Sequence, residues 1–202
     1  MSYIGIPFED EKYKNGPQVI PGRVMCAYYD MGGEGVAYHD VDGINHGSGE
    51  LNPINGSYLH SFRINEGVST SYTKFFDDID NNIYNYVEPE ENTLYVGWTK
   101  PGNWTRYTVD VKNTGIYTIS LLYTSRYGGK ISLDIDGQDE TDPIAVSSTY
   151  IEDDPLEWRQ WHHWNIAEIA KTKLTEGVHV LTLHTLETGE MNYCFLDFSL
   201  VQ

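Results

Sequence analysis

A chain of 202 residues has room for one sizeable domain, and its core needs neither a metal nor a disulfide on grounds of size. Hydrophobic residues make up 40% and charged residues 21%, which excludes a disordered chain, and no apolar run is long enough for a membrane helix. The formal charge of -17 excludes a nucleic-acid binder and a helix that binds anionic lipid, because both need clustered Lys and Arg.

The first half of the chain shows little regular periodicity. Residues 1–19 are polar with scattered apolar residues, and we predict an extended arm there, followed by a single domain over residues 20–202. A strand is predicted over residues 23–29. Residues 30–94 are rich in Gly, Asn and Asp and exceed an ordinary connection, so they predict functional loops that contain short strands.

Apolar and polar residues alternate through most of the second half, as in Tyr107 to Val111. This alternation buries one face of each strand, which is typical of antiparallel sheets. Turns rich in Gly and Asn separate the runs, so the pattern predicts an all-β antiparallel β-sandwich. A single helical turn, at residues 168–171, is the most that the pattern allows. The predicted strands cover residues 94–99, 105–111, 116–123, 130–136, 144–148, 158–166, 179–185 and 193–201.

Two patterns that suggest a metal site do not hold. An EF-hand loop that begins at Asp78 would need Gly where Ile83 stands and Glu where Pro89 stands. We interpret this segment as a solvated acidic loop, with a cation site of another kind as the alternative. His162 and His163 would point to opposite faces of a strand, so they cannot easily share a metal. No metal ligand is therefore assigned.

Catalytic motifs are not found either. The chain has no metalloprotease, phosphate-loop or nucleophile-elbow pattern. With 30 Asp and Glu, some pair of carboxylates will lie near any cleft, but no spacing singles out an acid and a base. We therefore predict no catalytic residues and no enzyme activity.

The five tryptophans are the most specific signal. Three of them form the pattern Trp158-x-x-Trp161-x-x-Trp164, which on a strand would place at least one ring outside the core. An exposed indole is a flat apolar platform on which the C–H face of a sugar ring can stack. The alternative for each single tryptophan is packing in the core.

Six motifs then follow one another in a single order along the chain. They are IPGRV at 20–24, YD-x-GGEGVAYHD at 29–40, FR-x-NEGV at 62–68, VGWTKPGNWTRYTVDV at 96–111, W-x-x-W at 158–161 and FLDF at 195–198. Together they resemble the family 6 carbohydrate-binding modules over nearly the whole chain. The resemblance implies a β-jelly roll that binds a poly- or oligosaccharide without cleaving it, as a partner or part of a secreted glycoside hydrolase.

The resemblance also implies a site in the loops at one end of the sandwich. Its two aromatic residues fall on Trp98 and Trp158, and its Glu position falls near His39. Its Asn position falls on Phe195, which is a departure, because a phenyl ring cannot replace the hydrogen bonds of an amide. Asn192 could compensate. The predicted polar neighbours of the sugar are His39, Glu34, Arg63 and Asn192.

Two further sites of the family map onto this chain. A second site on the face of the sandwich would fall on Trp104 and Asp134, although packing is the favoured role of Trp104. A structural calcium would be held by Asp197 and by residues at the positions of Met25 and Ala27. A thioether and a methyl group offer no oxygen to a hard cation, so we predict that this calcium site is lost and that no cofactor is required.

Export is a further expectation. No signal segment follows Met1 in this chain, but the resemblance implies a secreted, periplasmic or cell-surface protein.

Cys26 and Cys194 would lie on the first and last strands, which are neighbours in the fold that the resemblance implies. There they could form a bridge, but two buried thiols are favoured.

Two functions of other classes remain as alternatives to carbohydrate binding. One is a small glycan-cleaving jelly-roll enzyme that uses the acidic loops, which turnover of a polysaccharide panel would reveal. The other is an architectural or protein-interaction sandwich whose sugar site has degenerated. Binding without turnover would exclude both.

Overall fold

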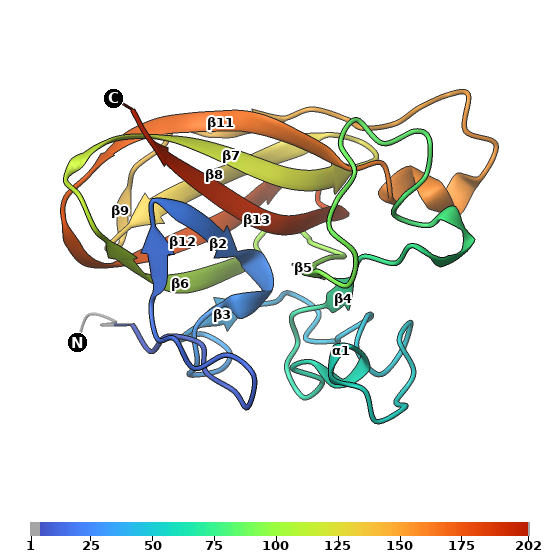
Figure 1. Cartoon of the computed structure of the whole chain (residues 1–202), viewed down its shortest axis with the longest axis horizontal. Coiled ribbons are helices and arrows are strands. Elements are labelled where there is room, and N and C mark those ends of the chain that lie inside the picture. The colour runs from blue at the N-terminus through green and yellow to red at the C-terminus, as the bar shows by residue number, and fades with distance from the viewer. Residues whose placement is uncertain (1–4, 202) are drawn as a thin grey trace.

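Two β-sheets packed face to face form the body of the protein, as the predicted antiparallel sandwich requires (Figure 1). The computed structural model describes residues 5–201, so residues 1–4 of the predicted arm and Gln202 lie outside the described residues. Named strands pair in antiparallel fashion, except that β1 runs parallel to β6.

The first sheet has seven strands. Its order is β1-β6-β12-β8-β10, with β3 beside β6 and β9 beside β8. The strands are β1 (Gln18–Ile20), β3 (Tyr38–His39), β6 (Trp104–Val111), β8 (Gly129–Ile135), β9 (Gln138–Asp139), β10 (Ile144–Val146) and β12 (Gly177–Glu187).

The second sheet has six strands. Its order is β11-β7-β13-β5-β4, with β2 beside β13. The strands are β2 (Gly22–Met25), β4 (Thr70–Tyr72), β5 (Leu94–Val96), β7 (Gly115–Ser125), β11 (Asn165–Leu174) and β13 (Met191–Leu200).

Helical structure within residues 5–201 is limited to one short α-helix and three 3-10 turns. They are α1 (Tyr58–Ser61), η1 (Cys26–Tyr28), η2 (Phe76–Asp78) and η3 (Glu157–Trp161).

Three of the predicted elements are wrong in detail. The strand predicted over residues 158–166 is a 3-10 turn up to Trp161, and only its end belongs to β11. The helical turn predicted over residues 168–171 is instead part of β11, which has a β-bulge there. The strand predicted over residues 23–29 ends at Met25, where η1 begins. In each case tertiary contacts override a weak local preference.

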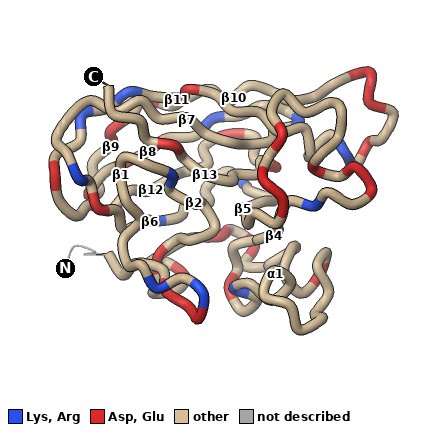
Figure 2. Tube along the Cα trace, in the orientation of Figure 1, with Lys and Arg blue, Asp and Glu red and all other residues tan. Residues whose placement is uncertain are grey.

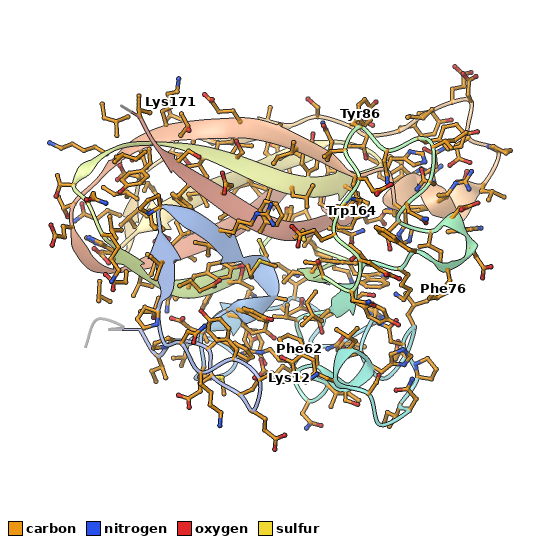
Figure 3. The ribbon with its side chains drawn as sticks, viewed as in Figure 1. Lys12, Phe62, Phe76, Tyr86, Trp164 and Lys171 are labelled. Atoms are coloured by element: carbon orange, nitrogen blue, oxygen red, sulfur yellow. The ribbon has the colours of Figure 1, made fainter. Side chains whose placement is uncertain are left out.

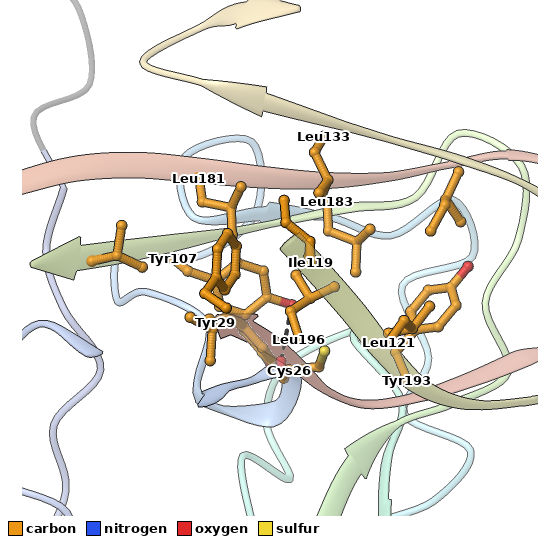
Figure 4. Close-up of a cluster of buried hydrophobic side chains, with 14 of the residues drawn as sticks. Cys26, Tyr29, Tyr107, Ile119, Leu121, Leu133, Leu181, Leu183, Tyr193 and Leu196 are labelled. Atoms are coloured by element: carbon orange, nitrogen blue, oxygen red, sulfur yellow. Dashed lines mark hydrogen bonds between the residues drawn. The ribbon is translucent and has the colours of Figure 1, made fainter. Parts of the chain in front are cut away.

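The core lies between the sheets and follows the alternation in the sequence. Tyr107 and Val109 of β6 point inward, as do Leu181 and Leu183 of β12, and they meet the inner side chains of β7 and β13 (Figure 4). The hydroxyl group of Tyr107 donates a hydrogen bond to the backbone oxygen of Cys26 at 3.1 Å, which satisfies a polar group that is buried in the core.

Both cysteines are free thiols, and both are buried. Burial raises the pKa of Cys26 to about 12, and it also raises the pKa of Cys194 well above its ordinary value. The thiols are therefore protonated at neutral pH, and neither resembles a reactive cysteine.

A second apolar cluster holds the N-terminal arm. Phe8 stacks on Tyr28 at a ring distance of 5.0 Å, and Tyr13, Tyr58 and Phe62 complete the group. Figure 3 shows Phe62 beside α1, in the lobe of loops below the sheets. The described part of the predicted arm is therefore packed, and its end becomes strand β1.

The outer face of the six-stranded sheet is covered by the loop between β4 and β5. Trp164 lies under this loop with no exposed surface, edge-on to Tyr95 (Figure 3). Its indole N–H donates to the Asp80 carboxylate at 2.7 Å, and its backbone oxygen accepts from the amides of Tyr86 and Val87. These bonds fix a long loop that has little regular structure.

Acidic residues are spread over the loops, while Lys and Arg positions are few and scattered (Figure 2). Within the described range, no helix has the length and apolar character that a membrane span requires.

Candidate functional site

The candidate site is a cleft of about 630 Å³ at the end of the sandwich where η3, orange in Figure 1, lies. A cleft of this size can hold a ligand as large as a short oligosaccharide. Its walls come from the loop after β3, the end of β5, η3 and the start of β13. The lining residues are His46, Leu51, Tyr95, Trp98, Lys100, Trp158, Trp161, His162, Glu190 and Asn192.

Trp98, one of the two predicted aromatic residues, stands where β5 ends. Its backbone has a φ of 50°, which is rare for a bulky residue and is found more often at functional sites than elsewhere. Two glycines make room around it. A Cβ on Gly97 would lie 2.6 Å from Oδ1 of Asn192, and a Cβ on Gly47 would lie 1.9 Å from the backbone oxygen of Thr70 and 3.2 Å from the indole.

Trp158, the other predicted aromatic residue, projects from η3 with 47% of its surface exposed. It is therefore not a core residue, in contrast to the packing alternative. Its ring meets the ring of His162 edge-on at 5.9 Å, and Nδ1 of His162 lies 2.8 Å from the buried Asp80 carboxylate. An exposed indole thus stands on a fixed support.

The turn that carries Trp158 is held by the buried carboxylate of Asp154. This group accepts from Nε and Nη2 of Arg159, each at 2.7 Å, and from the Leu156 amide at 3.0 Å, and it lies 2.7 Å from Nε2 of His163. Burial opposes ionisation of Asp154, but these bonds keep its pKa below the usual range. His162 and His163 thus have separate partners, as the sequence interpretation expected, although neither lies on a strand.

Asn192 is the predicted polar residue that the fold brings into the cleft. Its side-chain N–H₂ donates to Oγ1 of Thr124 at 2.9 Å and to the backbone oxygen of Trp161 at 2.8 Å. These bonds orient the amide so that its oxygen faces Gly97. Phe195 does not line the cleft; it packs with Trp164 on the outer face of the sheet.

Ionisable groups on the rim of the cleft pair with one another. The Lys100 ammonium group pairs with Asp42, and His46 lies between Asp42 at 3.2 Å and Glu50 at 3.5 Å. Burial raises the pKa of Asp42, but hydrogen bonds from Asp40, Lys100 and His46 outweigh this effect and hold the pKa below its usual range. Burial, and then the hydrogen bond shared with Asp42, raise the pKa of Asp40 to about 6.

Three predicted neighbours of the sugar lie outside the lining of the cleft. His39 is on β3, where it pairs with Trp104 of β6 and contacts the Glu34 carboxylate. Arg63 is buried, donates to the backbone oxygens of Tyr29 and Asp30, and pairs with a carboxylate. The structure therefore does not bring these three residues together with Trp98 and Trp158: β3 belongs to the other sheet, and the donors of Arg63 bind the backbone of its own surroundings.

Sequence reasoning missed several lining residues. Trp161 and His162 could have been predicted as lining residues, because they lie within the Trp158-x-x-Trp161-x-x-Trp164 pattern that contains Trp158. Lys100 lies two residues after Trp98. The loop residues had no periodicity that could assign them. The missed residues are His46, Leu51, Tyr95, Lys100, Trp161, His162 and Glu190.

The residues of the predicted second site lie on one face of the seven-stranded sheet. His184 of β12 is the cross-strand partner of Trp104, and it lies 2.7 Å from the Asp134 carboxylate. The Arg106 guanidinium stands 4.6 Å over the Trp104 ring. The hollow beside Trp104 is only about 10 Å³, so in this structure the face does not enclose a ligand.

The residues at the family's calcium position do not fit a hard cation. Met25 packs against the cluster around Trp164, and Ala27 is buried in η1. Asp197 is left with a hydrogen bond from Ser199. Between residues 5 and 201, no three His, Cys, Asp or Glu side chains gather as they would around a metal.

Comparisons with known structures give the same fold. A family 6 carbohydrate-binding module from Clostridium stercorarium, solved with cellobiose, is 12% identical, with a TM-score of 0.54, covering 93% of this chain and all (100%) of that chain. A β-1,3-glucan-binding family 6 module from Bacillus halodurans is 14% identical, with a TM-score of 0.52 and coverages of 90% and 98%.

An enzyme also contains this fold. A family 43 arabinoxylan arabinofuranohydrolase from Bacillus subtilis, solved with cellotetraose, is 15% identical, with a TM-score of 0.56, over 96% of this chain but only 30% of the enzyme. A search of curated proteins found no match.

The sequence itself matches a family model, "Carbohydrate binding module (family 6)", over residues 75–202, which is more than half of the chain. The proteins of this family bind carbohydrate and are generally not catalytic. The match confirms the resemblance drawn from the sequence motifs. The chain therefore belongs to family 6 of the carbohydrate-binding modules.

Proposed function

We propose that the cleft between Trp98 and Trp158 is the site at which this protein binds a neutral, β-linked glycan without cleaving it. One observation carries the proposal: indoles from two separate segments line the same cleft, Trp98 after β5 and Trp158 with Trp161 on η3, and Trp158 is half exposed on a rigid support. Faces of sugar rings stack on such surfaces, and the side-chain oxygen of Asn192, whose N–H₂ group already donates to the protein, is left to accept a hydrogen bond from a sugar hydroxyl.

The charges favour a neutral ligand. Lys100, His46 and His162 each face a carboxylate of the protein, so none of these three groups is left to bind an anionic sugar. The chain as a whole carries a charge of -17, which repels polyanions. The three similar structures, described with cellobiose, β-1,3-glucan or cellotetraose, suggest β-glucans as the first probes.

Absence of catalysis is part of the proposal. A glycoside hydrolase of the usual kind needs two carboxylates beside the scissile bond. Among the described residues that line the cleft, Glu190 is the one carboxylate. We further propose that the protein acts outside the cell beside a glycoside hydrolase, as a partner or part of the same chain, because modules of this family typically come from such enzymes.

The test combines binding, turnover and a matched variant. The protein is titrated calorimetrically with cello-, laminari- and xylo-oligosaccharides, and reducing sugar is measured in the same samples. Trp98→Ala should abolish detectable binding, whereas Tyr86→Ala, which removes an exposed ring outside the cleft, should leave it unchanged. Release of reducing sugar, or a Trp98→Ala variant that binds at wild-type strength, would overturn the proposal.

A further inference from the structure

The turn between β7 and β8 places an exposed aromatic ring next to the wall of the cleft. Tyr127 is 56% exposed, and its ring meets the ring of Trp161 edge-on, with centroids 6.3 Å apart and planes at 83°. Trp161 lines the cleft, whereas Tyr127 lies outside the lining. The aromatic surface of the cleft therefore continues onto the β7–β8 turn.

An arginine connects the two rings and the turn that carries Trp158. The Arg126 guanidinium stands 4.6 Å from the centroid of Trp161 and 5.1 Å from the centroid of Tyr127. Its Nη2 lies 2.5 Å from a carboxylate oxygen of Glu157, the residue just before Trp158. The β7–β8 turn is thus tied to η3, so Tyr127 keeps a defined position relative to the cleft.

The backbone of the turn is fixed as well. The Ser148 hydroxyl donates to the backbone oxygen of Arg126 at 2.6 Å, and Gly128, with a φ of 73°, lies so close to Val146 that a Cβ would be 2.9 Å from its backbone oxygen. A tyrosine that is exposed on a rigid turn loses little conformational entropy when a ligand covers it, which favours binding.

We propose that Tyr127 forms a further carbohydrate subsite, which takes the sugar unit that leaves the cleft past Trp161. This inference rests on the proposed function, since it assumes a glycan in the cleft. It means that the protein recognises linear chains longer than the cleft alone can hold. The ligand class is a linear oligo- or polysaccharide, whose units beyond the cleft contact Tyr127 by ring stacking.

The test is the dependence of affinity on chain length. Wild-type protein, Tyr127→Ala, Tyr127→Phe and Tyr86→Ala are titrated with cellobiose through cellohexaose and with the laminari and xylo series. Tyr86 is the matched control, because its ring is 59% exposed on a different loop and does not line the cleft (Figure 3). Thermal unfolding of each variant confirms that the fold is intact.

Wild-type affinity should rise along the series. Tyr127→Ala should lose about tenfold in affinity for the longest chain that binds, and almost nothing for the disaccharide. Tyr127→Phe and Tyr86→Ala should bind every chain like the wild type, because the ring and not the hydroxyl makes the contact.

Other outcomes overturn the proposal. Wild-type affinity that stops rising at the trisaccharide, a Tyr127→Ala variant equal to wild type on long chains, or an equal loss at every length would each overturn the subsite alone. In those cases the loss of binding in Trp98→Ala still supports the cleft. If wild-type protein binds none of the three series, both the subsite and the proposed function fail.

Discussion

Trp158 and Trp164 are the same type of residue six positions apart, but the structure places them in opposite environments. Trp164 is fully buried and donates to Asp80, whereas Trp158 is 47% exposed on the cleft. Truncating Trp164 to Ala should therefore cost stability, and truncating Trp158 should cost binding. The two variants therefore compare a structural role with the proposed binding role within one motif.

The magnitudes follow from burial. A fully buried tryptophan removes about 150–250 Å² from water, which at about 25 cal/mol per Å² is roughly 4–6 kcal/mol. Compaction of the unfolded chain reduces this value, so Trp164→Ala should cost about 3–5 kcal/mol. Trp158 is about half buried, and its loss should cost roughly 2 kcal/mol or less. For a protein of this size, 1 kcal/mol shifts Tm by about 2–4 °C.

The assay measures both quantities on both variants. Scanning calorimetry should show a Tm loss of about 6–20 °C for Trp164→Ala and a smaller loss, of about 8 °C or less, for Trp158→Ala. Titration with the longest cello-oligosaccharide that wild-type protein binds should show a loss of about thirtyfold or more for Trp158→Ala, equivalent to about 2 kcal/mol. Equal Tm losses in the two variants, or wild-type affinity in Trp158→Ala, would refute the reasoning.

Two further predictions concern stability. Asp154 has a pKa below its usual range, so its bonds stabilise the protein above the ordinary carboxyl pKa of about 3.9, and this contribution is lost as the pH falls below that value. Asp154→Asn breaks a buried pair with Arg159, so it should lower the free energy of unfolding, measured in urea at pH 7, by about 3 kcal/mol. The difference in stability between this variant and the wild type should become smaller in acid. A difference that stays constant with pH would contradict the prediction. Neither Ca²⁺ nor a chelator should shift Tm through the family's calcium position, because Met25 and Ala27 offer no side-chain oxygen. A rise of several degrees with Ca²⁺ that is lost in Asp197→Asn would contradict this prediction.

Most strands could be predicted because alternation of apolar and polar residues is a local signal with a direct physical cause. Val109 and Leu181 are apolar and lie in the core, while the residues next to them along each strand point to the opposite face. The 3-10 turn at Trp158 has a different cause. Its geometry depends on Asp154, whose carboxylate binds Arg159 and His163, and such contacts between side chains leave no periodic trace in the sequence.

The two tryptophans of the cleft could be placed together from the family motifs, but of their four predicted polar neighbours only Asn192 lines the same cleft. His39 lies in a motif that resembles the family's, yet β3 pairs with β6, which places His39 beside Trp104 instead. Arg63 is also part of a motif, and its backbone φ of 48° together with its bonds to Tyr29 shows a residue that shapes its own loop. A motif preserves an order along the chain, but the pairing of strands decides which cleft a residue faces.

Asn192 shows how a single extra residue in a strand can change the face to which a side chain points. Counting back from Phe198, whose side chain is in the core, strict alternation would also place Asn192 in the core and Tyr193 outside it. The structure has the opposite arrangement, because β13 contains a bulge between Tyr193 and Phe195. The bulge shifts the alternation by one, so the Tyr193 ring enters the core and the Asn192 amide turns to the cleft. We propose that this amide, from the other side of the bulge, replaces the one that the family motif lacks at Phe195.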